Sequence, residues 1–338
     1  MKKLLIVIFF LLLLGAGAAY YMIFGPDVKA DKAVITVPEG TTADSLIHLL
    51  KPYVHHTAGI RLAARLKRFH RPKAGKYLLQ PNMSANDLIN MFRSGRQVPV
   101  TLTFNNLGSL EKLAGKVSHV IHADSTSLLK AMRDKSFLTK HGFTPETALL
   151  MYVPNTYQLH YFTKPDQFRE RMWKEYLKFW NEKRRRQAQR LGLNPVETGI
   201  LASIVQKETH IPSEKGIVAR VYLNRLKKGM KLQADPTVVY AYRLTTGDTT
   251  TIQRVLKKHL AVDSPYNTYQ YEGLPPGPIC MPDRSTIDAV LNAPAHDYLY
   301  FSADPARPGH HLFAKSLKQH LQNARRYHKH LNKRKIFK

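Results

Sequence analysis

The sequence has little cysteine and few acidic residues. Its single cysteine, Cys280, excludes a disulfide scaffold, a cysteine-rich zinc module and a CxxC redox pair. Only 24 Asp and Glu residues stand against 52 Lys and Arg, which leaves a formal net charge of +28 at pH 7. A charge of this sign and size indicates nucleic acid or an anionic surface as a partner. Hydrophobic residues still make up 43% of the chain, so a wholly disordered polycation is excluded.

Patterns that bind metals are also missing. The chain has 16 histidines but no HExxH, and a dense basic chain collects histidine by composition, so we expect no metal and no cofactor. Cys280 has no activating partner that the sequence shows, and we expect an inert side chain there. At 338 residues the chain is long enough for two or three folded units.

An uncharged apolar run from Leu4 to Phe24 follows Lys2 and Lys3. As a helix it would span roughly 30 Å, the thickness of the hydrocarbon core of a bilayer. A cleaved signal peptide is the alternative, since Ala16-Gly17-Ala18 would serve as its cleavage site. The run continues beyond that site, which favours an uncleaved anchor. The two lysines place the N-terminus in the cytoplasm and the body outside it, which argues against a nucleic-acid partner.

Residues 33–104, which follow a polar linker at 25–32, have the pattern of a small α/β unit. The β-branched run at 34–37 predicts a strand, and Thr41 or Thr42 can cap the helix that follows. The further elements expected are a basic helix over 60–69, a strand around 77–79, a helix from 84 to 92 and a strand within 98–104.

The next part of the chain has helical patterns. Residues 110–142 are expected to be helical, and residues 167–191 are expected to form one long helix with an aromatic stripe. A stripe at this spacing indicates a core face rather than a platform for stacking bases. The stripe consists of Phe168, Trp173, Tyr176, Leu177 and Trp180.

The strongest candidate for chemistry is Glu208. A capping box of Asn194 and Glu197 starts a helix, which gives Glu197 a structural role. At about 100° per residue, Glu208 then falls in line with Leu201 and Ile204. Burial and the negative end of the helix both favour a protonated carboxyl there, as a general acid needs near neutral pH. The alternative is a structural glutamate paired with a Lys or Arg, because ion pairs also perturb pKa values.

Polar side chains gather downstream of this helix. Ser213 or Glu214 is expected to begin a second helix over 215–228, on which Asn224 lies on an apolar face. Asp235 precedes a proline and is expected to cap a short helix. Two rigid loops rich in proline, tyrosine and amide side chains suit the walls of a carbohydrate site. These loops are residues 264–269 and 273–279.

Several motifs occur together and in order, and their combination resembles one family. The sequence is similar to the membrane-anchored endolytic murein transglycosylases, the YceG-like proteins, over nearly the whole body. The motifs are ILASIVQKET (200–209), VARVYLNRLKKGMKLQADPTVVYA (218–241), SPYNTY (264–269), GLPPGPI (273–279), YVPNTY (152–157, resembling the family's PDTY) and the stretches 298–303 and 310–313.

The resemblance implies an α+β fold with four parts. These are a transmembrane anchor over 1–24, a linker over 25–32, a LysM-like α/β subdomain over 33–104, and a catalytic region of mixed helices and strands over 105–338 with its core at about 146–330.

The resemblance also assigns roles to residues. Glu208 falls on the catalytic glutamate of the family, whose usual EKET reads QKET here because Gln206 replaces the first Glu. Asn155 stands where the family usually has Asp, which puts a carboxylate role there in doubt. The predicted substrate contacts are Asn224, Gln233, Asp235, Thr237, Tyr266, Asn267 and Tyr269.

The activity implied is cleavage of the β-1,4 bond between N-acetylmuramic acid and N-acetylglucosamine within peptidoglycan strands, which leaves 1,6-anhydro ends. The resemblance further implies a role in limiting nascent strand length, peptidoglycan synthases as partners, and a single-pass location in the bacterial inner membrane with the catalytic body outside the cytoplasm. Two alternatives remain open. One is a hydrolase that uses Glu208 with Glu214 or Asp235, and the other is a non-catalytic, anchored peptidoglycan-binding scaffold.

Overall fold

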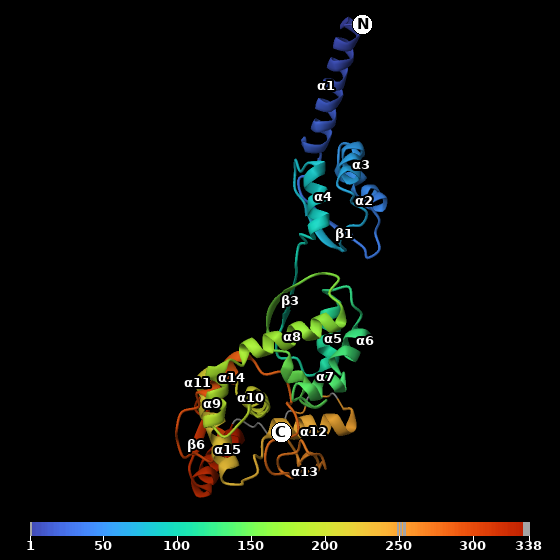
Figure 1. The fold of residues 1–338 in the computed structure, drawn as a ribbon. Coiled ribbons are helices and arrows are strands. Elements are labelled where there is room, and N and C mark those ends of the chain that lie inside the picture. Colours follow the sequence, from blue (N-terminus) through green and yellow to red (C-terminus); the bar gives the residue numbers. More distant parts are fainter. Residues whose placement is uncertain (1, 249, 251, 253–254, 334–338) are drawn as a thin grey trace. The chain divides into compact units, whose positions relative to one another are not determined.

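The chain has a mixed α+β fold with an apolar N-terminal helix, which confirms the predicted fold class at this level (Figure 1). The computed structural model describes residues 2–248, 250, 252 and 255–333. Two compact units make up the chain. Unit 1 consists of residues 1–102, 119–123 and 157–163, and unit 2 consists of residues 103–118, 124–156 and 164–338.

The first helix, α1 (Lys2–Phe24), is long and apolar enough to cross a membrane. Its side chains are exposed along almost the whole length, and Ile23 near its end is buried in the core of unit 1. A helix that presents apolar side chains on all sides suits a lipid environment. The helix therefore agrees with the predicted anchor, and its last turn belongs to the folded unit.

The rest of unit 1 is built on one antiparallel strand pair. Strand β1 (Ala33–Val37) pairs with β2 (Gly75–Leu79), with Ile35 opposite Tyr77. Side chains from the strands and the helices meet in one apolar core. The helices are α2 (Ala43–Leu50), the 3₁₀ turn η1 (Lys51–Tyr53), α3 (Thr57–Leu66) and α4 (Ala85–Ser94).

Capping residues set the helix ends in unit 1. Thr42 caps α2, and Ser84 forms a reciprocal capping box with Asp87 at the start of α4. The basic helix predicted over 60–69 is displaced to 57–66. It ends early because Arg68 takes a left-handed conformation, φ 49°, which turns the chain so that the amide of Phe69 donates to the carbonyl of Ala64.

Close approach of α3 to α1 depends on Gly59. A Cβ at this position would lie 2.1 Å from the carbonyl oxygen of Met22, which is backbone and cannot move aside alone. We expect Gly59→Ala to force the two helices apart and to lower the stability of unit 1 by about 1–3 kcal/mol. Thermal unfolding of the full chain in detergent measures this. Gly115→Ala is the control, because a Cβ there meets no atom within 4 Å, and equal losses in both variants would contradict the expectation.

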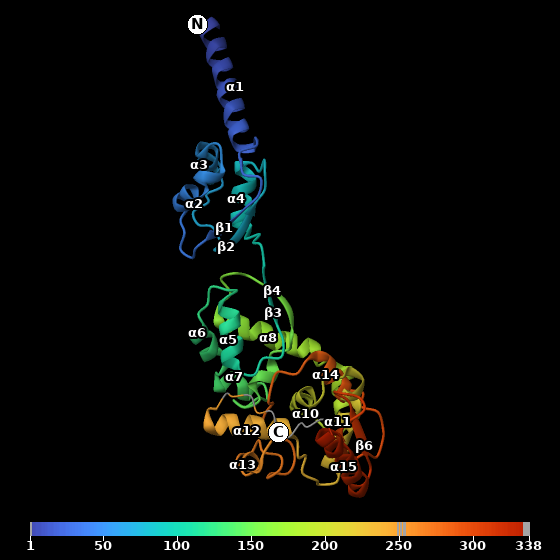
Figure 2. The same cartoon turned by 180° about the vertical axis from the view of Figure 1, so that it is seen from behind.

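A second strand pair joins distant parts of the sequence. Strand β3 (Val100–Phe104) pairs with β4 (Asn155–Leu159) (Figure 2). The hydroxyls of Thr103 and Thr156 lie 2.8 Å apart. Between these strands in the sequence lie α5 (Leu110–Ser118), α6 (Ser125–Met132), α7 (Lys135–Lys140) and the 3₁₀ turn η2 (Ala148–Met151).

The long helix predicted over 167–191 is two helices, α8 (Pro165–Phe179) and α9 (Glu182–Arg190). The break falls at Asn181, whose side chain accepts from the amide of Arg184 and caps α9. The aromatic stripe lies in the core as predicted at Phe168, Tyr176 and Trp180, whereas Leu177 is 41% exposed and does not belong to it.

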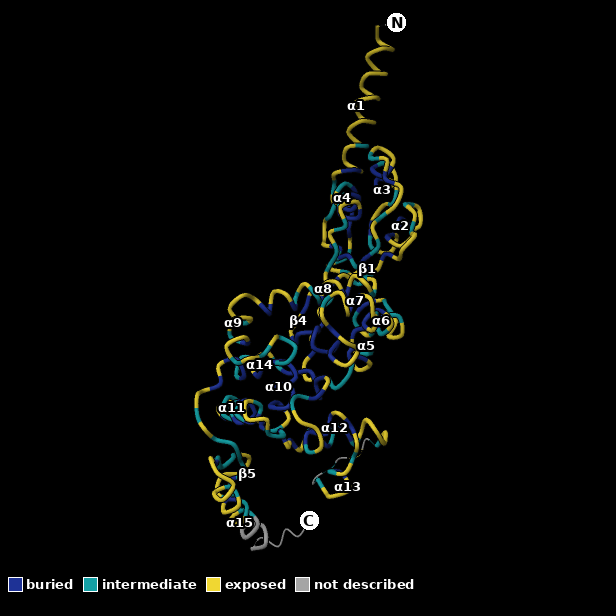
Figure 3. Tube along the Cα trace, turned by 60° about the horizontal axis from the view of Figure 1, so that its bottom comes forward, coloured by how far each residue is buried: buried dark blue, intermediate teal, exposed yellow. Residues whose placement is uncertain are grey.

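Helix α10 (Pro195–Glu208) lies at the centre of unit 2 and is buried along most of its length (Figure 3). Asn194 and Glu197 form the predicted capping box at its start. The helix packs against α9, α11, α12 and α14. The remaining elements are α11 (Pro212–Lys227), α12 (Asp235–Thr246), α13 (Lys257–Leu260), α14 (Arg284–Leu291), β5 (Tyr300–Ala303), β6 (His311–Ala314) and α15 (Leu317–Lys333).

Helix α11 starts one or two residues earlier than predicted. Ile211 is its N-cap residue and Pro212 its first residue, so neither Ser213 nor Glu214 begins it. Proline suits this position because it has no amide hydrogen and its φ is already helical. The tight turn formed by residues 209–211 therefore follows α10 directly, and α11 packs beside α10.

Candidate active site

Glu208 is the last residue of α10, and its partly buried carboxyl points to α11. The hydroxyl of Tyr222 donates to Glu208 Oε1 at 2.6 Å. Tyr222 itself is 1% exposed, so the hydrogen bond has a fixed geometry. Tyr222 thus provides the carboxyl with a neutral hydrogen-bond donor.

The surroundings of Glu208 favour its protonated form. The pKa of Glu208 is raised to about 7; burial is the largest cause, and the negative charge of Asp235 acts in the same direction. The hydrogen bond from Tyr222 and the charge of Arg225 act in the opposite direction. A large fraction of the carboxyl is therefore protonated at neutral pH, as a general acid requires.

The charge of Arg225 acts on Glu208, but the guanidinium of Arg225 donates to backbone carbonyls. Its Nε donates to the carbonyl of Leu299 at 2.6 Å, and its Nη1 donates to the carbonyl of Leu232 at 2.8 Å. Among the residues that the structure describes, Glu208 has no ion pair. The alternative of a structural glutamate held by a Lys or Arg is therefore not what the structure shows.

Asp235 forms a second polar pair near Glu208. The hydroxyl of Tyr269 donates to Asp235 Oδ1 at 2.7 Å, and the charge of Asp235 reaches Glu208. The prediction that Asp235 caps a helix is wrong. The N-cap residue of α12 is Ala234, and Asp235 is already helical, so its carboxylate lies outside the geometry for capping and accepts from Tyr269 instead.

Three other predicted contact residues use their polar groups within the protein. The amide of Asn224 donates to the carbonyls of His296 and Tyr298. The amide of Asn267 donates to the carbonyls of Leu260 and Val262, and the hydroxyl of Thr237 lies 2.8 Å from that of Thr268. These side chains hold the loops around the candidate site, and the structure gives each a structural role.

Tyr266 and Gln233 complete the predicted set. Tyr266 is 7% exposed, and its ring centre lies 4.8 Å from that of Tyr240. Gln233 is exposed, and its backbone has a left-handed conformation, φ 50°. Its backbone N–H donates to the carbonyl of Thr268. Asp235 and Tyr269 are thus the predicted contacts that the structure brings together near Glu208.

The sequence did not identify Tyr222 and Arg225 as part of the site. Both are polar residues on α11, which follows α10 after three residues. This proximity in sequence was the only indication that they could lie near Glu208. Which side chain of α11 reaches Glu208 depends on how the two helices pack, and the sequence does not give that register.

Asn155 and Gln206 have surroundings that differ from those of Glu208. Asn155 begins β4 and lines a hollow of about 300 Å³ together with Asp283 and Arg284. Gln206 is buried, and its amide donates to Asp283 Oδ2 at 2.5 Å while its oxygen accepts from Thr286. Gln206 therefore ties α10 to the start of α14.

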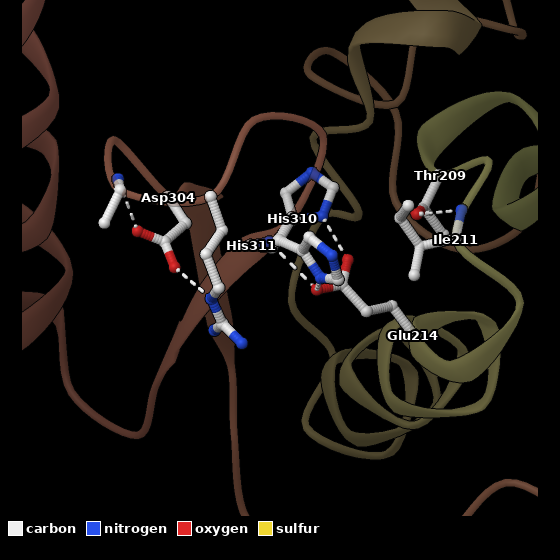
Figure 4. Close-up of polar contacts among 8 residues, drawn as sticks. Thr209, Ile211, Glu214, Asp304, His310 and His311 are labelled. Carbon is white, nitrogen blue, oxygen red and sulfur yellow. Dashed lines mark hydrogen bonds and ion pairs between the residues drawn. The ribbon is translucent and has the colours of Figure 1, made fainter.

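Glu214 is committed to a separate cluster (Figure 4). The ring Nδ1 atoms of His310 and His311 contact its two carboxylate oxygens at 3.0 and 2.8 Å, and the amide of His311 donates to Oε1 at 3.0 Å. Burial opposes ionisation, but these hydrogen bonds outweigh it and hold the pKa of Glu214 below its usual range. Glu214 thus fixes the β5–β6 hairpin to the start of α11, and the hairpin places Phe301 against the ring of Tyr222.

We expect Glu214→Ala to lower the free energy of unfolding by about 2–3 kcal/mol, because hydrogen bonds to a buried carboxylate are lost and their donors remain. Urea unfolding at pH 7 measures the change. The stabilisation is present above the ordinary glutamate pKa and is lost as pH falls through the lowered folded-state pKa. Glu182→Ala on the surface is the control, and an equal loss in that variant would contradict the role of the cluster.

Metal and thiol chemistry have no candidate in the described residues. No group of three or more His, Cys, Asp or Glu side chains there has an arrangement that would hold a metal ion. Cys280 is buried, and burial raises the pKa of its thiol to about 11, which makes it a poor nucleophile near neutral pH.

These features define an α+β protein with an N-terminal apolar helix and one carboxylic acid that is protonatable near neutral pH. The chain belongs to the YceG-like family, whose sequence profile matches residues 35–326. An endolytic murein transglycosylase from Bacillus subtilis strain 168 is 29% identical over 314 residues, which cover 87% of this chain and 84% of the relative.

Further similarities agree with this assignment. An endolytic murein transglycosylase from Streptococcus pneumoniae strain D39 is 27% identical over 88% of this chain, but the match spans only 59% of that longer relative. The 2.6 Å crystal structure of a yceG-like protein from Listeria monocytogenes is similar with a TM-score of 0.56 and 27% identity. That match covers 86% of this chain and 98% of the Listeria chain.

Proposed function

We propose that this chain is an endolytic murein transglycosylase that cuts peptidoglycan strands internally. The names of the relatives from Bacillus subtilis and Streptococcus pneumoniae support the activity. The observation that carries the chemistry is Glu208, whose pKa is raised to about 7 with no ion pair in the described part of the chain. The substrate is the β-1,4 bond between N-acetylmuramic acid and N-acetylglucosamine.

In the proposed reaction, Glu208 acts first as an acid and then as a base. The protonated carboxyl donates its proton to the glycosidic oxygen while C1 develops oxocarbenium character and the bond to the leaving sugar breaks. The C6 hydroxyl of the muramic residue then attacks C1, and the Glu208 carboxylate accepts the hydroxyl proton. The product is a 1,6-anhydro end, and no water is consumed.

Glu208 alternates between neutral and ionised forms in this scheme, and Tyr222 serves the ionised one. Its hydroxyl donates to Oε1 and lowers the pKa of Glu208 against the effect of burial. A single carboxylate suffices because the nucleophile belongs to the substrate, whereas ordinary glycosidases use two. Glu214, one of the partners considered for a hydrolase, is bound by two histidines.

Asp235 and Tyr269 are the substrate contacts that we propose beside Glu208. Both are at least partly exposed, and their paired hydroxyl and carboxylate can bond sugar hydroxyls or the N-acetyl group. Gln233 is exposed two residues before Asp235 and joins them in the proposal. We assign the predicted contacts with buried or occupied polar groups to the support of the site walls. These are Asn224, Thr237, Tyr266 and Asn267.

Tyr222→Phe tests the proposed role of this hydroxyl. Loss of a hydrogen bond to the carboxylate should reduce the cleavage rate about 10-fold to 100-fold and raise the pKa of Glu208, so that the alkaline limb of the pH–rate profile moves to higher pH. Initial rates measured across the pH range report both effects. Tyr271→Phe is the matched control, since this exposed tyrosine bonds Asp263 outside the site. An unshifted profile in Tyr222→Phe would contradict the role.

Digestion of purified sacculi tests the activity against the scaffold alternative. The full chain in detergent should release soluble muropeptides from sacculi, and chromatography with mass spectrometry should detect them. Retention on sacculi without any soluble product would favour a binding scaffold and would overturn the proposal.

The proposal extends to location and partners. Lys2 and Lys3 before an apolar helix support a single-pass arrangement in the bacterial inner membrane, with the N-terminus in the cytoplasm and the catalytic body outside. We further propose that unit 1 includes a LysM-like glycan-binding subdomain, and that peptidoglycan synthases are partners whose nascent strands the enzyme shortens. Protease accessibility in spheroplasts tests the orientation, because a body that resists external protease until lysis would contradict it.

A further inference from the structure

The end of α1 and the start of α3 are in direct contact within unit 1. Gly59 approaches the backbone of Met22 so closely that a Cβ would lie 2.1 Å from its carbonyl oxygen. Ile23 is buried in the same core cluster as Ile60. Helix α3 therefore begins beside the last turn of the apolar helix, as Figure 1 shows.

This contact sets the depth of α3 relative to a membrane. Met22 belongs to the apolar run that spans the bilayer, so Gly59 lies at the boundary between hydrocarbon and head groups. The ten residues of α3 extend only about 15 Å. Every residue of α3 is thus within reach of the head-group region on the side of the folded body.

The segment 61–73, which includes most of α3, carries positive charge only. Residues 61–73 contain six Lys and Arg and no Asp or Glu. All four arginines of this segment are exposed, and no hydrogen bond or ion pair of their side chains is found among the described residues. We call these four the α3 basic surface: Arg61 and Arg65 on α3, and Arg68 and Arg71 in the segment that follows it.

The neighbouring acidic and apolar side chains agree with a free cationic surface. Asp27 is buried and accepts from the amide of His56, and Asp87 is used in the capping box of α4. Leu66, within the basic segment, is 69% exposed. An apolar side chain among arginines is typical of helices that lie at a membrane interface.

We propose that the α3 basic surface binds the anionic phospholipid head groups of the leaflet that faces the folded body, with Leu66 inserted at the interface. The proposal rests on α1 as a membrane span and is independent of the catalytic proposal. Because α1 and α3 belong to one unit, the head groups are always present at high effective concentration. A dissolved polyanion has no such advantage, and this favours lipid over nucleic acid or a wall polymer. Each arginine near an anionic surface strengthens the attraction about fivefold.

A fluorescent label at position 66 tests the proposal in the full chain. Leu66→Cys is labelled with an environment-sensitive dye and reconstituted into phosphatidylcholine vesicles with or without phosphatidylglycerol. Native Cys280 is buried, which leaves position 66 as the reactive thiol. We expect emission at shorter wavelength in the anionic vesicles, with the shift reversed by high salt because surface charge interactions are screened.

Charge variants of the labelled Leu66→Cys chain show whether the arginines cause the emission shift. Replacing the four arginines with Gln should abolish the difference between vesicles, and replacing them with Lys should keep it. Removing four exposed charges in unit 2, at Lys140, Lys174, Lys183 and Arg190, should leave it unchanged. Equal emission in both vesicles, or a shift that persists in the Gln variant, would overturn the proposal. A response to dissolved polyphosphate over neutral vesicles as strong as that to phosphatidylglycerol would overturn the assignment to lipid.

Discussion

Glu208→Gln is expected to reduce cleavage of peptidoglycan by at least about 1,000-fold. The amide has nearly the same shape as the carboxyl but cannot donate a proton to the glycosidic oxygen or accept one from the C6 hydroxyl. Release of soluble muropeptides from sacculi by the full chain, at enzyme levels high enough to detect residual activity, measures the loss.

Glu197→Gln is the matched control for this variant. It is the same substitution at the other end of the same helix, and glutamine can still complete the capping box with Asn194. We expect near-normal activity from it. Comparable losses in both variants would mean that damage to α10 explains the effect, and cleavage by Glu208→Gln would remove Glu208 from the mechanism.

Glu208→Gln is expected to lose activity but to gain stability above about pH 7. The folded-state pKa of Glu208, about 7, lies above the ordinary value of 4.5. Between these two pH values the carboxyl is protonated in the folded state and ionised in the unfolded chain. The contribution of Glu208 to stability is therefore present at low pH and lost as pH rises through 7. Above that pH, Glu208→Gln should be more stable than the natural chain by about 3 kcal/mol, and below pH 4.5 the two should converge. Urea unfolding at both extremes measures this.

The rate of cleavage is expected to fall about tenfold for each pH unit above about 7. Only the protonated form of Glu208 can donate to the leaving oxygen, and its population falls tenfold per unit beyond the pKa. Initial rates between pH 5 and pH 9.5 at constant ionic strength, with sacculi well below saturation, give kcat/KM and therefore report the pKa of Glu208 in the free enzyme. A rate that stays constant up to pH 9 would show that the proton donor is not a carboxyl with this pKa.

Local features of the sequence predicted the elements that depend on local chemistry. The capping box of Asn194 and Glu197 and the Thr42 cap each satisfy free amide groups within a few residues. The placement of Glu208 on an apolar stripe likewise follows from helix periodicity, and its raised pKa agrees with that reasoning. These properties need no knowledge of the tertiary fold.

The features that sequence reasoning missed depend on distant contacts. Asp235 was expected to cap a helix, but Tyr269, 34 residues away, binds its carboxylate. Tyr222 reaches Glu208 only because α11 packs beside α10 in one particular register. The break between α8 and α9 has a local cause, the Asn181 cap. The sequence analysis missed this cap because the aromatic spacing continues across it and predicted one helix.

The net charge of +28 has a more specific interpretation once the fold is known. Several basic residues in unit 2 serve the structure, such as Arg225, which binds backbone carbonyls, and Arg184, which pairs with Asp288. The α3 basic surface differs, because its arginines are exposed and follow Gly59, which contacts the end of the apolar helix. A composition that suggested nucleic acid thus fits an anionic lipid surface better.

The chemical nature of the newly cut glycan ends tests the central claim most directly. Purified peptidoglycan digested by the full chain in ¹⁸O-labelled water should give muropeptides that end in 1,6-anhydro-N-acetylmuramic acid and carry no label, because the C6 hydroxyl and not water attacks C1. Ordinary reducing ends that contain ¹⁸O would contradict the account and would establish a hydrolase.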